Sequence, residues 1–339
     1  MNTETVMCAV EQPESGGGVA AGAGMRTVRR ACVDMVRQPE LRGVLRHDEP
    51  MSRHVSWRAG GNAARTYQPA DMADLQVFIK TLPANEAVYF VGLGSNLLVR
   101  DGGLDATVVF SHWAMRTLRL EPDGHRIYAE CGLPSPKVAR FAALHGLVGA
   151  EFLAGIPGTV GGALAMNAGC YGGETWDIVE RGLTIDRHGN LHERMRAQYE
   201  LAYRSVHLKE QTNRRDIDEW FVASTFRLVP GDGVASRERI RELLGRRIAT
   251  QPLGEPNAGS VFRNPDGDFA ARLIEACGLK GYSIGDAVIS PKHANFIVNR
   301  GRARAADIES LIEAAQSAVK ARFGVELERE VRIIGERAA

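Results

Sequence analysis

The chain has 339 residues, and 44% of them are hydrophobic, as in an ordinary globular protein. Its length suggests two or three domains, because one domain usually takes roughly 100–200 residues. With 42 basic and 41 acidic side chains and five cysteines that form no CxxC pair, the sequence argues against a nucleic-acid-binding protein, a zinc site and a secreted disulfide framework.

The N-terminal residues are predicted to be a tail. Residues 16–24 contain only glycine, alanine and valine, which is a low-complexity composition. The N-terminal segment as a whole carries Glu4 and Glu11 and has no long apolar core, so it does not resemble a signal peptide. No apolar run in the chain approaches the ~20 residues that a membrane span needs. We expect a tail over residues 1–44, disordered in its first part, on a cytoplasmic protein.

Helices and strands are predicted to alternate in the first half of the chain. Residues 70–82 favour a helix with Asp71 as its N-cap and with Leu75, Phe78, Ile79 and Leu82 on one apolar face. The apolar runs of this half predict strands at 87–91, 107–110 and 126–131, and a helix from Pro134 to about residue 145.

The second half continues the alternation after a break. Strands are predicted at 178–186 and 221–229, and the Pro-Gly-Asp-Gly run at 230–233 predicts a domain boundary. The elements expected beyond the boundary are helices at 236–249, 270–277 and 305–323 and strands at 294–298 and 330–334. The pattern indicates an α+β or α/β protein of two or three units.

Glycine-rich residues 92–103 directly follow the strand predicted at 87–91. Free backbone N–H groups in such a loop can hold a pyrophosphate, and Ser95 and Asn96 can add hydrogen bonds. Neither the G-x-G-x-x-G fingerprint nor a Walker A lysine is present. A plain hairpin around Asp101 and Gly102 is the structural alternative.

A second glycine-rich segment covers residues 155–173. It has few bulky side chains, so its backbone can wrap a flat ring with hydrogen-bonding edges, such as a flavin. A merely mobile loop fits less well, because Ile156, Val160, Leu164 and Met166 need burial.

These segments resemble those of the UDP-N-acetylenolpyruvoylglucosamine reductase family. The matching motifs are Arg-Ala-Gly-Gly-Asn-Ala at 58–63, Gly-Leu-Gly-Ser-Asn-Leu-Leu at 92–98, Gly-Ile-Pro-Gly-Thr-Val-Gly-Gly-Ala at 155–163, Met-Asn-Ala-Gly at 166–169, Tyr-Arg-Ser at 203–205, the run 251–265 and Glu-Arg-Glu-Val-Arg-Ile-Ile-Gly at 328–335. They follow in the family's order over about residues 45–336. The short stretch from Asn264 to Arg272 resembles the family's short-loop subclass, which lacks a covering tyrosine from an inserted loop.

The resemblance implies an α+β fold. The FAD-binding region would be vanillyl-alcohol-oxidase-like (PCMH-type), would cover residues 45–230 and would consist of two subdomains that meet near residue 112. A C-terminal α+β substrate-binding domain would cover residues 231–339.

The resemblance also implies noncovalent FAD and NADPH as cofactors. The first glycine segment contains no His or Cys that could tether the flavin, which agrees with noncovalent binding. The sequence does not distinguish NADPH from NADH. The residues implied to bind FAD are Arg58, Gly92, Gly94, Ser95, Asn96, Gly155, Ile156, Pro157, Gly158, Thr159, Gly161, Gly162, Asn167, Ala168 and Gly169.

The implied reaction reduces UDP-N-acetylglucosamine enolpyruvate to UDP-N-acetylmuramate. Hydride from flavin N5 adds to the far carbon of the enol ether, and negative charge spreads from the near carbon into the neighbouring carboxylate. Arg204 can hold this carboxylate, because a guanidinium is always charged and can donate twice. By resemblance, Glu330 helps to polarise it and Ser260 protonates the near carbon as general acid.

Three further residues are expected to contact the diphosphate or the sugar, namely Arg263, Lys292 and Asn295. Beyond its substrate and NADPH we expect no partner: no nucleic acid, no membrane insertion, and a monomer.

Two other interpretations stay open at the level of sequence. One is an FAD-dependent sugar or alcohol oxidase with the same FAD domain, which would leave Arg204, Ser260 and Glu330 together without a role. The other is a flavin- or nucleotide-binding protein without chemistry, which is distinguished by whether NADPH turns over the bound flavin.

Overall fold

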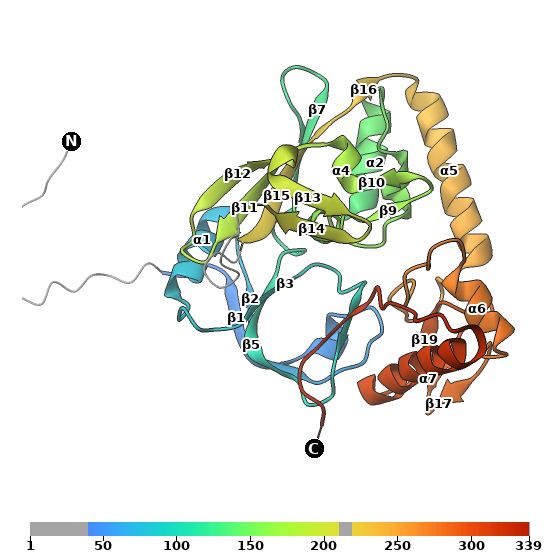
Figure 1. Ribbon diagram of the computed structural model, residues 1–339. Helices are drawn as coiled ribbons and strands as arrows, with labels where there is room; N and C mark the ends of the chain where they lie inside the picture. Colours follow the sequence, from blue (N-terminus) through green and yellow to red (C-terminus); the bar gives the residue numbers. More distant parts are fainter. Residues whose placement is uncertain (1–39, 210–218, 339) are drawn as a thin grey trace, which may run out of the picture. The chain divides into compact units, whose positions relative to one another are not determined.

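The structure is a computed structural model that describes residues 40–209 and 219–338. Of the tail predicted for residues 1–44, residues 1–39 lie outside the described residues, and Val44 already begins the first strand. Residues 40–339 form one unit, in which antiparallel and mixed sheets alternate with helices (Figure 1). This arrangement confirms the α+β class. None of the helices in the two described ranges has the length and apolar character needed to cross a bilayer.

The first sheet has the strand order β1-β2-β5-β3. Strands β2 and β3 run parallel to β5, and β1 is antiparallel to β2. Helix α1 (Met72–Thr81) begins as predicted at Asp71, whose carboxylate accepts from the N–H of Asp74 at 2.9 Å. The strands are β1 (Val44–Pro50), β2 (Asn62–Gln68), β3 (Val88–Val91) and β5 (Leu104–Phe110), with a short 3₁₀ turn η1 (Met51–Arg53) after β1.

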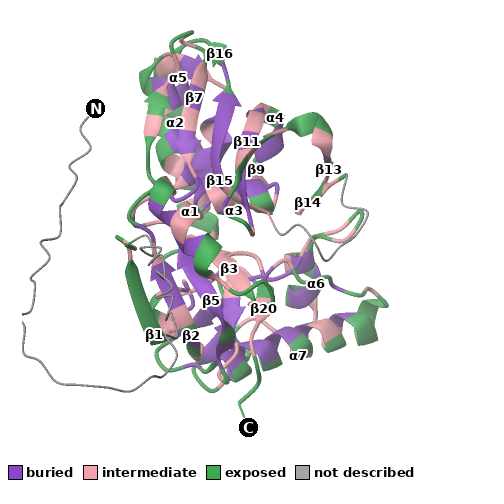
Figure 2. Ribbon diagram, turned by 90° about the vertical axis from the view of Figure 1, so that its left-hand side faces the viewer, coloured by how far each residue is buried: buried purple, intermediate pink, exposed green. Residues whose placement is uncertain are grey.

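The second sheet is antiparallel throughout, with the order β12-β11-β15-β7-β6. One face, including Phe226, packs on α2 and α3, while Val222 on the other face packs against α1 and the first sheet. Figure 2 shows the central strands of this sheet as buried. The elements are β6 (Leu118–Leu120), β7 (Arg126–Glu130), α2 (Ser135–Leu144), η2 (Glu151–Gly155), α3 (Val160–Ala165), β11 (Val179–Asp186), β12 (Leu191–Met195) and β15 (Glu219–Arg227).

The strand predicted at 221–229 ends two residues early. The ladder with β7 ends at the Arg227–Arg126 pair, although the N–H of Leu228 still donates to the carbonyl of His125 at 3.0 Å. Val229–Pro230 then forms a separate short strand, β16, against β8 (Leu147–Val148).

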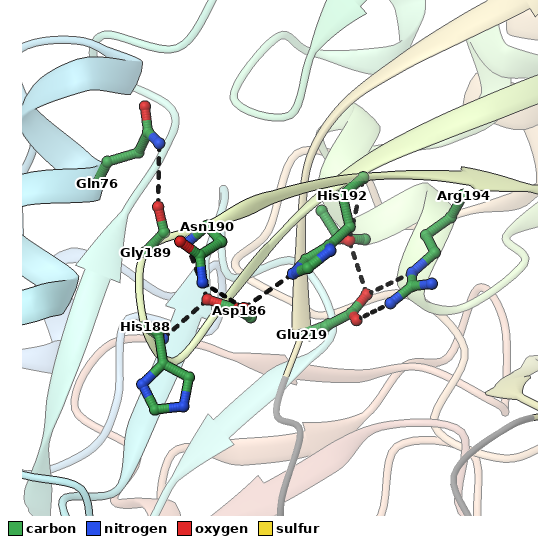
Figure 3. Close-up of polar contacts among 9 residues, drawn as sticks. Gln76, Asp186, His188, Gly189, Asn190, His192, Arg194 and Glu219 are labelled. Atoms are coloured by element: carbon green, nitrogen blue, oxygen red, sulfur yellow. Dashed lines mark hydrogen bonds and ion pairs between the residues drawn. The ribbon is translucent and has the colours of Figure 1, made fainter.

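The turn between β11 and β12 is a polar unit built around Asp186 (Figure 3). Its carboxylate accepts from the N–H groups of His188 and Asn190, both at 2.8 Å, and contacts His192 Nε2 at 2.8 Å. Burial opposes ionisation, but these hydrogen bonds hold the pKa of Asp186 below its usual value. Gln76 of α1 donates to the Gly189 carbonyl at 3.0 Å, so the turn fastens the second sheet to α1.

The C-terminal part has its own layer of a sheet and a helix, in which α7 covers the three-stranded sheet β17-β18-β19. Helix α7 (Ala305–Phe323) has the predicted bounds. The strand predicted at 294–298 begins only at Ile297, because residues 290–296 form a turn closed by the N–H of Ser290 and the carbonyl of Phe296 at 2.8 Å. The other elements are α5 (Gly233–Thr250), α6 (Ala270–Ala276), β17 (Ser283–Ile284), β18 (Ala287–Ile289), β19 (Ile297–Asn299) and β20 (Arg332–Ile334).

The C-terminal segment returns to the first glycine segment. Strand β20 pairs in parallel with β4 (Leu97–Val99), and the buried Trp57 donates to the Ile297 carbonyl at 2.7 Å. Asp101 accepts from the N–H groups of Ala305 and Ala306, both at 2.9 Å, at the start of α7. Chain segments that are far apart in sequence therefore form one hydrogen-bonded frame.

Arg100 reinforces this frame through a two-pronged ion pair with Glu309 of α7, at 3.0 and 2.8 Å. The guanidinium holds the pKa of Glu309 below its usual value, and the Glu309 side chain is only 7% exposed. Because the folded-state pKa is depressed, this stabilisation is complete above the unfolded-state pKa of about 4.3 and is lost as the pH falls below it.

Glu309→Gln should therefore lower the free energy of unfolding at pH 7 by about 1–3 kcal/mol. Urea unfolding at several pH values measures this, and the difference from the parent should shrink as the pH falls toward 3. Glu313→Gln on the same helix is the matched control, because its side chain is 58% exposed and contacts the tip of Arg337. Equal losses for both variants, or a loss that does not depend on pH, would contradict the assignment.

Candidate active site

A cavity of about 620 Å³ brings together the three residues expected to be catalytic, Arg204, Ser260 and Glu330. They come from three distant parts of the sequence. Arg204 lies in the turn between β13 (Tyr199–Ala202) and β14 (Ser205–Leu208), while Ser260 and Glu330 lie in the C-terminal part. The other lining residues are Gly169, Cys170, Gly172, Gly173, Glu174, Asp177, Tyr203, Phe262, Asn264 and Asn295.

Arg204 is held in place by an ion pair and a backbone contact. Its Nε donates to Glu330 Oε1 at 2.8 Å, and its Nη2 donates to the Gly169 carbonyl at 2.8 Å. The two side chains of the ion pair are 14% and 15% exposed. Arg204 has a φ of 56°, a left-handed conformation that costs about 1 kcal/mol for a residue other than glycine. The hydrogen bonds of its side chain offset this strain and fix the guanidinium at the cavity.

Ser260 and Glu330 share a backbone frame. The N–H of Glu330 donates to the carbonyl of Val261, the residue after Ser260, at 2.8 Å. Gly259 has a φ of 77°, a conformation that glycine adopts without a steric penalty, and the turn there brings Ser260 to the cavity wall. Ser260, Glu330 and Arg204 thus line one space.

The predicted substrate contacts differ in their positions. Asn295 lines the cavity, but its amide is engaged with the backbone of Phe262, donating at 2.8 Å and accepting at 2.9 Å. Arg263 donates to the Arg204 carbonyl at 3.4 Å, and its buried Nε has no partner among the described residues. Lys292 is not part of the cavity lining, and its ammonium group donates to the Ile248 carbonyl at 2.6 Å.

Asn167 supports the cavity wall formed by β9 (Gly169–Cys170) and β10 (Gly173–Glu174). It has a φ of 41° and is 2% exposed. Its amide donates to the Glu174 carboxylate at 2.7 Å and accepts from the N–H of Trp176, the second residue of α4 (Thr175–Ile178), at 3.1 Å. Both ends of the predicted cofactor residue Asn167 are therefore used within the protein.

Two lining residues were missed by the sequence reasoning although a signal was present. Tyr203 directly precedes Arg204 in the Tyr-Arg-Ser motif, is 45% exposed, and its ring centre lies 4.7 Å from the Arg204 guanidinium carbon. Glu174 follows the Gly172-Gly173 pair that ends the second glycine segment. Both face the cavity and can contribute to recognition of a polar ligand.

Cys170 also lines the cavity, but it is not poised to react. Its thiol donates to the Phe152 carbonyl at 3.0 Å. Burial raises the pKa of Cys170 to about 11, so the thiol is neutral near pH 7. A neutral thiol is a poor nucleophile, which argues against a covalent cysteine linkage in this cavity.

The two glycine segments predicted to bind FAD meet each other. A Cβ placed on Gly92 would lie 2.3 Å from Thr159 Oγ1, and one placed on Gly158 would lie 3.2 Å from Ser95 Oγ. The N–H of Ser135, at the start of α2, donates to the Gly158 carbonyl at 3.0 Å, and its buried hydroxyl has no partner in the described part of the chain. The close approach of the two segments, the hydroxyls of Ser95, Ser135 and Thr159 and a helix start suit a diphosphate, so the residues present fit FAD.

The remaining predicted cofactor residues differ in their exposure and in their contacts. Arg58 is exposed, with a φ of 56°, and Pro157 is exposed as well. The others are Gly94, which lies against the His54 carbonyl, Asn96, which is hydrogen-bonded to Glu330, and Gly155, Ile156, Gly161, Gly162, Ala168 and Gly169, which belong to or follow η2 and α3.

Gly92→Ala should weaken FAD binding by about tenfold or more, because the added methyl group would push the two glycine segments apart. The dissociation constant can be measured by titrating the apoprotein with FAD and following the flavin fluorescence. Gly245→Ala in α5 is the control, since a Cβ there meets no atom of the described residues within 4 Å. An unchanged dissociation constant for Gly92→Ala would show that FAD does not use this junction.

Comparisons of the sequence with known proteins all point to one family. A profile described as an FAD binding domain matches residues 63–194, and one described as UDP-N-acetylenolpyruvoylglucosamine reductase, C-terminal domain, matches residues 251–334. The chain is 60% identical over 311 residues to the UDP-N-acetylenolpyruvoylglucosamine reductase of Thiobacillus denitrificans, covering 88% of this chain and 94% of that one. It is 48% identical to the enzyme of that name from Legionella pneumophila, covering 90% and 96%.

A solved structure gives the same result. The crystal structure of UDP-N-acetylenolpyruvylglucosamine reductase from Thermus caldophilus superposes with a TM-score of 0.72 at 29% identity, covering 87% of this chain and 99% of that one.

Proposed function

The chain belongs to the UDP-N-acetylenolpyruvoylglucosamine reductase family, and on that premise we propose how its own residues carry out the reaction. It is an FAD- and NADPH-dependent oxidoreductase of peptidoglycan precursor synthesis. Its substrate is UDP-N-acetylglucosamine enolpyruvate, which it reduces to UDP-N-acetylmuramate. The observation that carries this assignment is the meeting of Arg204, Ser260 and Glu330 at one cavity.

FAD would be held by the junction of the two glycine segments, through Gly92, Ser95, Gly158 and Thr159, and when bound it supplies the hydride. The protein residues then have two tasks, which are to accommodate the charge that develops on the substrate and to deliver a proton. The contacts of the cavity residues support a division of these tasks between the Arg204–Glu330 pair and Ser260.

Arg204 binds the substrate carboxylate. Its Nε is occupied by Glu330 and its Nη2 by the Gly169 carbonyl, so the guanidinium plane is fixed before the substrate arrives. A fixed positive group stabilises the charge that spreads into the carboxylate, and a key donor of this kind typically contributes about 3–4 kcal/mol to the transition state. Glu330 orients the guanidinium. Because the Glu330 carboxylate is already paired with Arg204, the substrate carboxylate does not face an unpaired negative group.

Ser260 delivers the proton to the carbon next to the carboxylate. A serine hydroxyl is a weak acid, but the carbon that it protonates is strongly basic when the negative charge has built up. The Arg204 guanidinium lines the same cavity, and its positive charge favours the alkoxide left on Ser260.

We further propose that the enzyme acts in the cytoplasm as a monomer and binds neither nucleic acid nor a membrane. The near-neutral net charge of +1 supports the second part of this proposal, because it provides no strong general attraction for polyanions.

The experiment that tests the function uses the purified holoprotein without oxygen. NADPH should bleach the flavin absorbance, and UDP-N-acetylglucosamine enolpyruvate should restore it and yield a product that is heavier by one hydride and one proton in the mass spectrum. If the enolpyruvate leaves the flavin bleached while oxygen restores its colour, the protein is an oxidase and the proposed function is wrong.

A further inference from the structure

Asn96 contacts the residue that polarises the substrate. It lies in the first glycine segment, where a cofactor contact was expected, but its Nδ2 donates to the backbone carbonyl of Glu330 at 3.1 Å. The Asn96 carbonyl accepts from the N–H of Arg332 at 3.0 Å. The side chain and the backbone of one residue thus bind the chain on both sides of Val331.

Further pairing secures this contact from two directions. Directly after Asn96, Leu97 starts β4 and pairs in parallel with Arg332 of β20. On its other side, Glu330 donates through its N–H to Val261, next to Ser260. A line of hydrogen bonds therefore runs from Asn96 through Glu330 to the Ser260 turn.

We propose that Asn96 is a positioning residue for Glu330: its amide fixes the backbone of Glu330 so that the carboxylate meets Arg204 and, through it, the substrate carboxylate. This inference rests on the proposed function of Glu330. The Asn96 side chain would then serve the reduction of the substrate and not the binding of the cofactor. Loss of the donor would leave a half-buried carbonyl without its partner and would let the carboxylate move.

Measuring flavin reduction by NADPH and flavin reoxidation by the substrate separately distinguishes a role in positioning Glu330 from a role in binding FAD. Reduction of bound FAD by NADPH does not involve a substrate carboxylate, so Asn96→Ala should leave its rate and the FAD dissociation constant within about twofold of the parent. Reoxidation by UDP-N-acetylglucosamine enolpyruvate depends on Glu330 and should slow by about tenfold, the usual scale for the loss of one hydrogen bond that aligns a charged group. Stopped-flow absorbance measures both halves on the same holoprotein.

A double-mutant cycle shows whether Asn96 acts through Glu330. In a Glu330→Gln background the carboxylate is already lost, so adding Asn96→Ala should slow reoxidation by only about twofold further. Asn190→Ala is the matched control, because its amide also donates to a protein oxygen, Asp186 Oδ2 at 3.1 Å, in the β11–β12 turn outside the cavity (Figure 3). This control should leave both half-reactions at the rate of the parent.

Hydrogen exchange provides a readout that does not depend on activity. Amides of residues 329–334 should exchange faster in Asn96→Ala than in the parent, while those of the β11–β12 turn should not change. Unchanged exchange at 329–334, a parallel loss of FAD affinity and NADPH reduction, or independent effects in the cycle would each overturn the inference. If the parent enzyme itself is not reoxidised by the enolpyruvate, the proposed function fails first, and this result is distinct from any of these.

Discussion

Ser260→Ala should slow reoxidation of the flavin by UDP-N-acetylglucosamine enolpyruvate by about 10²–10⁴-fold, the usual range for loss of a general acid. Ser260 lines the same cavity as the Arg204–Glu330 pair, and the carbonyl of its neighbour Val261 accepts from the N–H of Glu330. Removing one oxygen atom leaves that frame intact, so FAD binding and reduction by NADPH should stay at the parent rates. Single-turnover stopped-flow absorbance measures this difference.

Ser283→Ala is the control for this substitution, because Ser283 is an exposed serine of the same C-terminal part, in β17. It should behave as the parent does in both halves of the reaction. If Ser260→Ala reoxidises at the parent rate, the proton comes from another group and the role of Ser260 is wrong.

Arg204→Lys should lower the rate of substrate reduction by about 10²–10³-fold although the charge is kept. A lysine ammonium group cannot contact Glu330 and the Gly169 carbonyl simultaneously in the fixed planar geometry of the guanidinium. The apparent KM for the enolpyruvate should rise as well, because Arg204 also binds the carboxylate in the ground state. Steady-state kinetics with varied substrate separates these two effects.

The control for charge retention is Arg239→Lys on α5, an exposed arginine that pairs with Glu242 at 2.6 Å. Exposed pairs of this kind contribute little, so activity and stability should be unchanged. Full activity of Arg204→Lys would mean that a general positive charge is sufficient and that the pairing geometry has no role.

Local signals predicted the helices better than the strands. Helix α7 has both bounds as predicted, because its apolar residues keep the helical period and Gly324, with a φ of 71°, ends it. Helix α5 begins three residues before its predicted start, because the Asp232 carboxylate accepts from the N–H groups of Val234 and Ala235. The run Pro-Gly-Asp-Gly at 230–233 was interpreted as a domain boundary, so Asp232 was not recognised as the N-cap of this helix.

The site was predictable as a set of residues but not as an arrangement. Motif order singled out Arg204, Ser260 and Glu330, and they line one cavity. Their supports come from contacts between distant segments, such as the hydrogen bond from the Asn96 side chain to the Glu330 carbonyl, which joins residues 234 positions apart. A parallel pair of short strands such as β4 and β20 has no local sequence signal, so the second role of Asn96 required the structure.

The second glycine segment shows a further limit of sequence reasoning. Its backbone was expected to wrap a flat ring, and no helix was predicted in it, but part of it forms helix α3. A Cβ on Gly161 of this helix would lie 2.9 Å from Cys131 Cβ. Of the four residues expected to need burial, Ile156, Val160 and Leu164 are buried and Met166 is half-buried. Here glycine serves close packing between elements as well as access for a ligand.

A crystal structure of the oxidised holoenzyme with UDP-N-acetylglucosamine enolpyruvate, without NADPH so that no turnover occurs, would test the central claim most directly. The account predicts the substrate carboxylate within hydrogen-bonding distance of the Arg204 guanidinium, with the Ser260 hydroxyl facing the carbon that bears it. A carboxylate bound elsewhere, or an enol ether on the far side of the cavity from Ser260, would contradict it.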